Sequence, residues 1–261
     1  MSEREPRNIR LSVVIPTVNT ADRIAATVGQ VAAYLAAKPF ASEIVVVDDG
    51  SSDRTAEAAR EGPAGQAVVK VIRHERNLGK GAAVRTGVLA SSGEIVLFSD
   101  DDLSTPIAEC DRLMAAIEAG ADAAIGSRAL PASNIRVRQR RPRELMGKAF
   151  NRLVRLFVLK GYPDTQCGFK AFRREAAMSV FRPLRTAGFG FDVEALVRCR
   201  DLGLRVAQLP VVWSDSRPSR LRILRGSWGM LRDLWRIRKQ ARRDARARSA
   251  SAGAGKKGRE T

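Results

Sequence analysis

Short apolar runs alternate with longer helical patterns through the first half of this chain of 261 residues, and no other feature constrains the fold as strongly. The apolar runs that fit buried strands lie at 11–15, 43–47, 67–72, 94–98 and 121–126. Helical patterns fill the intervals, at 21–38, from 53 onward, at 79–91 and at 106–119. This alternation predicts an α/β fold in which a mostly parallel sheet carries helices on both faces.

The second half of the chain is less regular. Its expected elements are helices at 143–159, 173–181 and 192–202 and a strand at 205–213. From Ser219 to Gln240 apolar residues recur every three or four positions among arginines, with Trp228 and Trp235 in the apolar stripe. Such a helix suits either a membrane interface or packing on the domain. After Ala241 the composition cannot form a core, so a disordered basic tail is expected.

Three consecutive aspartates, Asp100 to Asp102, end one of the apolar runs. Like charges this close repel each other, and burial at a strand end makes them unfavourable unless a cation neutralises them. In an extended chain Asp100 and Asp102 project to the same side, which suits a hard divalent ion held through oxygen and shared with a diphosphate. The alternative is an acidic turn before a helix starting near Pro106, with Ser104 or Thr105 as its N-cap.

A second acidic pair, Asp48 and Asp49, follows the run at 43–47. Ligands of parallel α/β sheets lie beyond the C-terminal ends of the strands, so both acidic segments are expected at one edge of the sheet. This shared location is the first argument for a binding site. Asp48 taken alone fits better as the start of an Asx-turn before the helix near Asp53.

The net charge of +18 is concentrated in two basic stretches, 135–160 and 216–261. Such a surface attracts phosphate groups, either of nucleic acid or of anionic lipid. Aromatic residues make up only 5% of the chain, which leaves few side chains to stack on bases. Carboxylates at strand ends would also repel a nucleic-acid backbone. A basic nucleic-acid-binding protein is therefore a remote alternative, and an anionic membrane surface is the expected partner.

The three cysteines, Cys110, Cys167 and Cys199, are widely spaced and include no CxxC pair. This scattered set argues against a disulfide framework or a zinc site and favours a reducing compartment. The N-terminal residues lack the apolar core of a signal peptide, and no apolar stretch reaches the roughly 18 residues that suggest a membrane span. We expect a cytoplasmic protein that contacts the inner face of a membrane only peripherally.

Short motifs occur in a fixed order along the chain. The first set is VVIPT at 13–17, VVDDGSSD at 46–53 and NLGKG at 77–81. With the aspartate triplet, this set resembles glycosyltransferase family 2, whose nucleotide-sugar-binding domain has the GT-A fold. The second set is GSR at 126–128, DTQCGFK at 164–170 and GFGFDVE at 188–194. It resembles the dolichyl-phosphate β-glucosyltransferase branch with its bacterial polyprenyl-phosphate relatives, and the resemblance covers about 11–222.

The resemblance implies a nucleotide-sugar site at the edge of the sheet. Its expected residues are Pro16, Thr17, Asn19, Asp49, Lys80 and Asp101. Asp100 and Asp102 would hold Mg²⁺ or Mn²⁺, which neutralises the diphosphate as the sugar–phosphate bond breaks. Family members commonly carry a Tyr and an acidic residue where Val18 and Thr20 stand here, which leaves the base preference open.

The acceptor that the resemblance implies is a polyprenyl phosphate. Its phosphate oxygen is already a competent nucleophile, so it needs cationic positioning more than a strong base. The candidate phosphate contacts are Arg128, Arg143, Arg141 and Arg220. The predicted catalytic residues are Asp102, Asp164 and Arg128, and the predicted sugar or acceptor pocket contains Gln166, Asp192 and Glu194.

Each acidic candidate in the second half also has a structural alternative. Asp164 could cap the turn after Pro163, and Asp192 and Glu194 could satisfy free amides at a helix start. His74, the single histidine, follows a strand among charged residues and is interpreted as a surface residue and not a catalyst.

Together these features predict an inverting, metal-dependent glycosyltransferase that moves a hexose from a nucleotide sugar to polyprenyl phosphate at the cytoplasmic face of a membrane. UDP-glucose is the expected donor, UDP-N-acetylgalactosamine and GDP-mannose are the alternatives, and a soluble acceptor is a third possibility. The expected organisation is an N-terminal arm at 1–10, a GT-A domain at 11–215, a basic amphipathic membrane-surface helix at 216–240 and a disordered tail at 241–261.

Overall fold

The structure of the chain is a computed structural model that describes residues 8–65, 67–137, 141–215, 232–241 and 243. Within these residues, one large sheet contains β1 (Leu11–Thr17), β2 (Ser42–Asp48), β3 (Val68–Arg73), β4 (Ile95–Ser99), β5 (Ala123–Ser127), β7 (Phe169–Arg173) and β8 (Val206–Pro210). A separate small sheet pairs β6 (Asn134–Val137) with β9 (Val212–Ser214). The helices are α1 (Ile24–Ala36), α2 (Thr55–Glu61), α3 (Lys80–Ala90), the 3₁₀ turn η1 (Ile107–Glu109), α4 (Cys110–Glu118), α5 (Arg141–Phe157), α6 (Arg174–Phe181) and α7 (Phe191–Asp201).

The main sheet has the strand order β3-β2-β1-β4-β7-β5-β8 and is mostly parallel, as predicted. Its one antiparallel member is β7, which lies between β4 and β5. Because β1, β2 and β4 run in the same direction, they end at the same edge of the sheet. At that edge Thr17 of β1 is paired with Asp48 of β2, and β4 ends beside them at Ser99.

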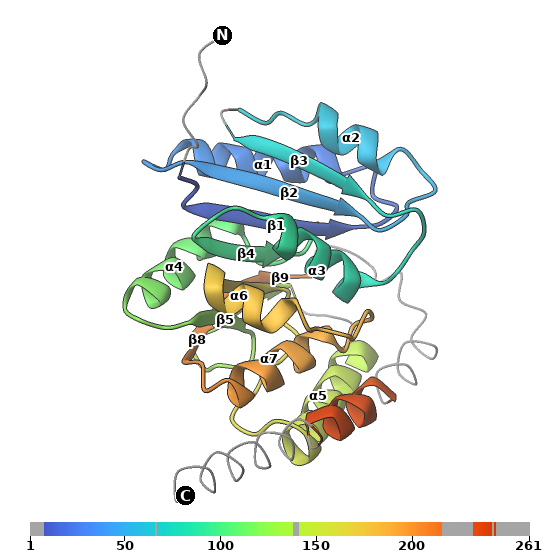
Figure 1. Cartoon of the computed structure of the whole chain (residues 1–261), viewed down its shortest axis with the longest axis vertical. Helices are drawn as coiled ribbons and strands as arrows, with labels where there is room; N and C mark the ends of the chain where they lie inside the picture. The colour runs from blue at the N-terminus through green and yellow to red at the C-terminus, as the bar shows by residue number, and fades with distance from the viewer. Residues whose placement is uncertain (1–7, 66, 138–140, 216–231, 242, 244–261) are drawn as a thin grey trace, which may run out of the picture.

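Both faces of the sheet are covered by helices (Figure 1). Along β1, Val13 and Ile15 pack on the face that α1 and α4 cover, whereas Val14 packs with α3 on the opposite face. A strand that is buried on both faces needs apolar residues at every position, which explains the continuous apolar runs in the sequence. The same architecture places the ends of these strands at the solvent edge, where ligands of such sheets bind.

The strands and helices expected in the first half are confirmed, with ends shifted by a few residues. The single strand expected at 205–213 is wrong, because the chain leaves the main sheet at Pro210 and Val212 begins β9, which pairs with β6. The sequence also gave no expectation of β6 or β7. Lys170 is the second residue of β7, and lysine is uncommon in strands, so this short run did not indicate a buried strand.

The helix α5 packs against residues 232–241, which are helical and drawn in red in Figure 1. Phe150 and Val154 of α5 share an apolar cluster with Leu234 and Ile237. Only this part of the expected helix at 216–240 can be compared with the structure, since 216–231 lie outside the described residues, as do 1–7 and 244–261. Among the described helices, none is both long enough and apolar enough to cross a membrane.

Candidate functional site

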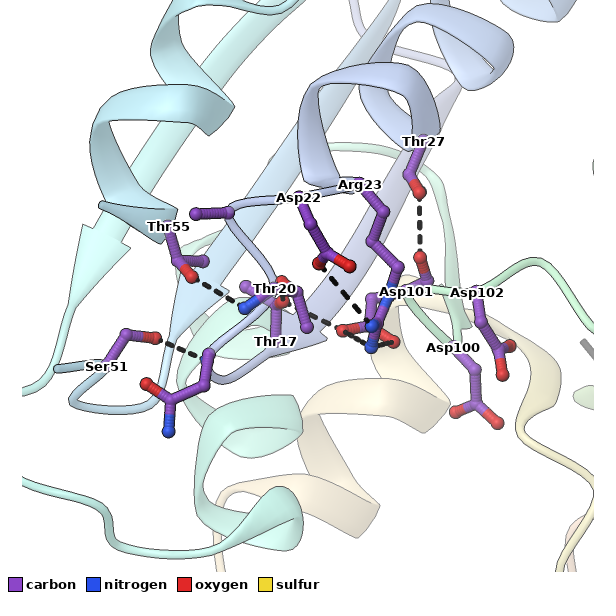
Figure 2. Close-up of polar contacts among 12 residues, drawn as sticks. Thr17, Thr20, Asp22, Arg23, Thr27, Ser51, Thr55, Asp100, Asp101 and Asp102 are labelled. Atoms are coloured by element: carbon purple, nitrogen blue, oxygen red, sulfur yellow. Dashed lines mark hydrogen bonds and ion pairs between the residues drawn. The ribbon is translucent and has the colours of Figure 1, made fainter. Parts of the chain in front are cut away.

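The three aspartates after β4 lie in a tight turn. The amide of Leu103 donates to the carbonyl of Asp100 at 3.2 Å, and Leu103 adopts a positive φ of 46°. Figure 2 shows Asp100 and Asp102 on one side of this turn, with the Asp101 carboxylate directed back toward Arg23. Asp100 and Asp102 do share a side, as expected, but the cause is the turn and not an extended chain.

Asp101 is held by residues of β1 and α1 (Figure 2). Arg23 donates to both of its carboxylate oxygens at 3.1 Å, and the Thr17 hydroxyl donates to one of them at 2.9 Å. The hydroxyl of Thr27 donates to the Asp101 carbonyl at 2.7 Å. Burial raises the pKa of Asp101 even though the Arg23 charge opposes this. Asp101 therefore joins the turn to the start of α1.

Asp100 is paired with Lys80, the first residue of α3. The Lys80 ammonium donates to the Asp100 Oδ1 atom at 2.5 Å. Burial would lower the pKa of Lys80, but the charges of Asp100 and Asp192 outweigh this and raise it. The Asp100 carboxylate also lies directly on Gly168, where an added Cβ would be 2.2 Å from Oδ2. Glycine at 168 is thus required for this position of the carboxylate.

Asp49, at the end of β2, is engaged by the loop before α3. Its carboxylate accepts the amides of Leu78 at 2.9 Å and Gly79 at 2.7 Å and the Nδ1–H of His74 at 2.7 Å. The other ring nitrogen of His74 lies 2.9 Å from the hydroxyl of Thr86 on α3. The side chain of His74 is only 10% exposed, so its interpretation as a surface residue is wrong.

The loops after β1 and β2 are joined to each other. Asp48 accepts the amide of Ser51, three residues on, at 2.9 Å, so it supports the local turn, although this bond is not the expected Asx-turn, which joins residues two apart. Asn19 has a positive φ of 52°, its amide donates to the Ser51 hydroxyl at 2.9 Å, and its side-chain oxygen accepts the amide of Ser52 at 2.9 Å. Pro16 and Thr17 are buried just before this loop. The predicted nucleotide-sugar residues therefore lie at one edge of the sheet.

The structure brings together Arg128, just after β5, and Asp164, in the loop before β7. Arg128 donates through Nε at 2.7 Å and through a terminal nitrogen at 2.9 Å to the two Asp164 oxygens, and its own amide donates at 2.9 Å. The guanidinium also lies 5.6 Å from the ring centre of Trp213. Burial favours the neutral form of Asp164, but the Arg128 charge and hydrogen bonds prevail and lower its pKa to about 2. Asp164 thus fixes the orientation of Arg128.

A buried lysine connects this region to the Lys80 pair. Lys170 is 0% exposed, donates to the Cys167 carbonyl at 2.6 Å and forms an ion pair with Asp192. Burial raises the pKa of Asp192, against the opposing charges of Lys170 and Lys80. Asp192 is therefore shared electrostatically by two lysines, one in the core and one beside Asp100.

Glu194 lies on the same helix as Asp192 but faces another loop. Its carboxylate accepts the amides of Arg185 and Thr186, the latter at 2.7 Å, and pairs with Arg198 at 2.7 Å. The next carbonyl, that of Ala187, accepts the amide of Gly81 at 2.7 Å. Glu194 therefore supports the loop that packs on the start of α3, and the amides that it accepts lie in this loop and not at the helix start that its structural alternative named.

The remaining candidates are placed less completely. Gln166 is half-buried, and its backbone amide donates to the Asp164 carboxylate at 3.1 Å. Arg141 and Arg143 lie at the start of α5, but their side chains are outside the described part of the structure, as is the whole of Arg220. Their proposed contacts with an acceptor phosphate stay predictions.

Two carboxylates of this site could hold a metal ion. Within the described residues no group of three or more His, Cys, Asp or Glu side chains is arranged to bind one. Asp100 and Asp102 nevertheless present oxygen ligands on one side of the turn, and Mg²⁺ is commonly held by one or two carboxylates together with substrate phosphates. The donor set fits a hard divalent ion whose other ligands come from a diphosphate and water.

Comparison with known proteins identifies the family. The family model described as Glycosyl transferase family 2 matches residues 12–181. The chain belongs to glycosyl transferase family 2. It is 33% identical over 228 residues to the dolichyl-phosphate beta-glucosyltransferase ALG5C of Trichomonas vaginalis, which covers 84% of this chain and 68% of that protein. It is also 33% identical over 243 residues to the Drosophila melanogaster dolichyl-phosphate beta-glucosyltransferase, covering 88% of this chain and 74% of the relative.

Solved structures agree with this assignment at the level of the fold. The glucosyl-3-phosphoglycerate synthase of Mycobacterium tuberculosis, crystallised with Mn²⁺, UDP-glucose and phosphoglyceric acid, matches with a TM-score of 0.69. The two are 24% identical, and the match covers 88% of this chain and 80% of that one. The expected GT-A fold and the expected glycosyltransferase family are thereby confirmed.

Within this family 2 domain, two structurally important residues escaped the sequence analysis. Arg23 neutralises Asp101, and Trp213 lies against Arg128. A signal for Arg23 existed, because a basic residue at a helix N-cap opposes the helix dipole and requires a nearby acid. Trp213 lies in β9, just after the chain passes from the main sheet to the small one, and nothing in its local sequence indicates a partner.

Proposed function

We propose that this glycosyltransferase moves glucose from UDP-glucose to a polyprenyl phosphate, with inversion, at the cytoplasmic face of a membrane. The observation that carries the proposal is the half-buried pair Asp100 and Asp102 beside Lys80, at the edge of a sheet that also presents the Arg128 guanidinium. The substrates rest on similarity to dolichyl-phosphate beta-glucosyltransferases over more than four fifths of the chain.

The donor would lie over the ends of β1, β2 and β4. The joined loops at 17–20, 48–52 and 77–80 form its nucleotide side, and Lys80 supplies a positive charge to the diphosphate. Asp100 and Asp102 would hold Mg²⁺ or Mn²⁺, which when bound neutralises the diphosphate as a leaving group. Since these carboxylates are oriented before the substrate arrives, little reorganisation is needed in the transition state.

The acceptor phosphate would be positioned by Arg128. Asp164 holds the guanidinium through two hydrogen bonds and Trp213 lies against it, so the charge keeps a fixed direction. A phosphate oxygen is nucleophilic without deprotonation by a side chain, and direct attack on the anomeric carbon inverts its configuration. With a pKa lowered to about 2, Asp164 is a poor proton acceptor, and we assign it the role of positioning Arg128.

A membrane-facing surface is proposed on α5 and the helix at 232–241. Its exposed apolar side chains are Leu145 at 70%, Leu156 at 63%, Phe157 at 53% and Trp235 at 63%. Basic side chains lie among them: Arg238 is 5.7 Å from the Phe157 ring and Lys239 is 4.8 Å from the Trp235 ring. Aromatic and cationic groups on one face favour the headgroup region of an anionic bilayer.

The test is a donor screen with purified full-length protein, polyprenyl-phosphate liposomes and Mg²⁺ or Mn²⁺. Labelled UDP-glucose, UDP-N-acetylgalactosamine and GDP-mannose are compared in wild type, Asp102→Ala and the control Asp111→Ala, whose carboxylate pairs with Lys38 away from the site. We expect transfer of label to lipid from UDP-glucose in wild type and Asp111→Ala and its loss in Asp102→Ala.

Each other outcome of the screen corrects a different part of the proposal. Transfer from another donor changes the sugar but keeps the reaction. Transfer that needs no liposomes and labels a soluble acceptor would remove the lipid substrate. Equal transfer by Asp102→Ala and wild type would remove the metal assignment.

A further inference from the structure

The Lys80 ammonium occupies the place on Asp100 where a divalent ion would bind. Its Nζ atom lies 2.5 Å from Oδ1 of Asp100, which is hydrogen-bonding distance for an ion pair. Both carboxylate oxygens lie against Gly168, because a Cβ added there would be 2.2 Å from Oδ2 and 2.3 Å from Oδ1. One side of the carboxylate is thus covered by the chain and Oδ1 is paired with the lysine, which leaves little room for an ion beside the ammonium.

A divalent ion and an ammonium cannot share this oxygen without strong repulsion. Like charges about 4 Å apart repel each other more strongly in a partly buried site than in water. The amide of Asp100 is hydrogen-bonded to the Gly168 carbonyl at 3.1 Å, which fixes the backbone of this residue, whereas the Lys80 side chain is long and flexible. Binding of the ion therefore requires the ammonium to leave.

The structure provides a second carboxylate for the displaced ammonium. Asp192 is buried, is paired with Lys170 in the core, and follows Phe191, whose Cβ would lie 2.6 Å from a Cβ added at Gly81, the residue after Lys80. Lys80 also begins α3 after Gly79, whose φ of +107° fixes the entry of the helix, so the long side chain can move while its backbone stays in place. A nucleotide diphosphate at this edge would be a third anionic partner.

We propose that Lys80 is a built-in counter-ion that competes with the divalent ion for Asp100, and that it moves to the diphosphate and Asp192 when the metal–nucleotide complex binds. This inference rests on the proposed function. It assigns Lys80 a role that nucleotide contact alone does not include: it opposes binding of the ion in the absence of nucleotide. Ion and nucleotide then bind cooperatively, since each relieves the same ion pair.

The experiment measures Mn²⁺ binding to full-length protein by electron paramagnetic resonance, with and without UDP. Wild type is compared with Lys80→Met, which removes the charge at similar volume, and with Lys80→Arg, which keeps it. The control is Lys38→Met, which breaks a lysine–aspartate pair elsewhere. Thermal unfolding of each variant, with Lys80→Gln as a second neutral variant, shows that the proteins compared are folded.

We expect Lys80→Met and Lys80→Gln to bind Mn²⁺ alone about tenfold more tightly than wild type, within the range of ordinary coupling energies. The enhancement of Mn²⁺ affinity by UDP should shrink by the same factor. Lys80→Arg and Lys38→Met should behave like wild type.

Equal or weaker Mn²⁺ binding by the neutral variants without UDP overturns the inference. The assay uses neither sugar donor nor acceptor, so its result is separate from that of the donor screen. No Mn²⁺ binding by any variant, even with UDP, overturns both the inference and the metal assignment of the proposed function.

Discussion

The turns after β2 and β4 are both rich in aspartate and lie at the same edge of the sheet, yet they use their carboxylates differently. After β2, the side chains of Asp48 and Asp49 are 0% and 4% exposed. After β4, the Asp100 side chain is 34% exposed and pairs with a lysine. The turn after β2 uses both acids to shape the chain, whereas the turn after β4 leaves part of the Asp100 carboxylate accessible to a ligand.

The identity of the partner distinguishes the two cases. Asp48 and Asp49 accept backbone amides of Ser51, Leu78 and Gly79, and those amides cannot leave without unfolding their loops. Asp100 is paired with a flexible side chain that can exchange partners. The acids after β2 therefore support structure, whereas Asp100, bound by a mobile cation, can exchange that cation for a metal ion.

The largest effect is expected at Asp102. Asp102→Asn should lower kcat/KM for sugar transfer by about 10²- to 10³-fold, since a bound ion supplies several kcal/mol of charge stabilisation to the transition state. The free energy of unfolding should change by less than about 0.5 kcal/mol, because the side chain is only half-buried and asparagine keeps an oxygen for the Ser104 amide that Asp102 accepts at 3.0 Å. Steady-state kinetics measure kcat/KM, and urea unfolding measures the free energy of unfolding. A loss of stability matching the loss of activity would place Asp102 with the structural acids.

Substitution of Asp49 should instead lower stability more than substitution of Asp102 does. Asp49→Ala leaves two amides and a histidine without their acceptor, which should lower the free energy of unfolding by about 3 kcal/mol. Asp49→Asn keeps one acceptor oxygen and should lose less. Urea denaturation with both variants checks this. An Asp49→Ala protein as stable as wild type, but unable to bind UDP, would show that the turn after β2, like the turn after β4, uses its carboxylate to bind a ligand.

Much of this contrast could be anticipated from sequence, and the limits have physical causes. The apolar runs that predicted β1, β2 and β4 also located both acidic turns at one edge, because parallel strands share a direction. That Asp48 supports a turn was predicted from its local sequence alone, although the bond spans three residues and not the two of an Asx-turn. What local sequence could not show was the long-range partner: Arg23 reaches Asp101 across 78 positions, and Lys170 is buried at a position where its strand was not expected.

The second half was harder to predict for the same reason. The family resemblance pointed to Arg128 and Asp164, but not to their mutual ion pair across 36 positions. Asp192 and Glu194 looked equivalent in a glycine-flanked helix start, yet two residues along a helix place side chains on different sides. Only the tertiary structure shows that Asp192 lies toward Lys170 and Lys80 and Glu194 toward the 185–186 amides.

The contribution of Asp164 to stability is expected to depend on pH. Its pKa is lowered from 3.8 to about 2 by Arg128, so the ionised pair stabilises the folded state above pH 4 and this contribution is lost as pH falls toward 2. The stabilisation is on the order of 2 kcal/mol. Urea unfolding of wild type and Asp164→Asn should therefore differ most at pH 6 and converge between pH 4 and pH 2. A difference that stays constant over this range would mean that the ionised pair contributes no stability.

The smallest effect is expected from Gly168→Ala, which tests whether contact with Gly168 positions the Asp100 carboxylate in the turn after β4. The added Cβ would lie 2.2 Å from Oδ2 of Asp100, so that carboxylate must rotate while the fold is kept. We expect a loss of stability of about 1 kcal/mol, as in mild overpacking, with Mn²⁺ binding in the presence of UDP weakened several-fold. Gly147→Ala is the matched control, because an added Cβ there meets nothing within 4 Å and should strengthen α5 slightly. If Gly168→Ala bound Mn²⁺ as tightly as the control, contact with Gly168 would not determine the position of Asp100, and the difference between the two turns would lie in Lys80 alone.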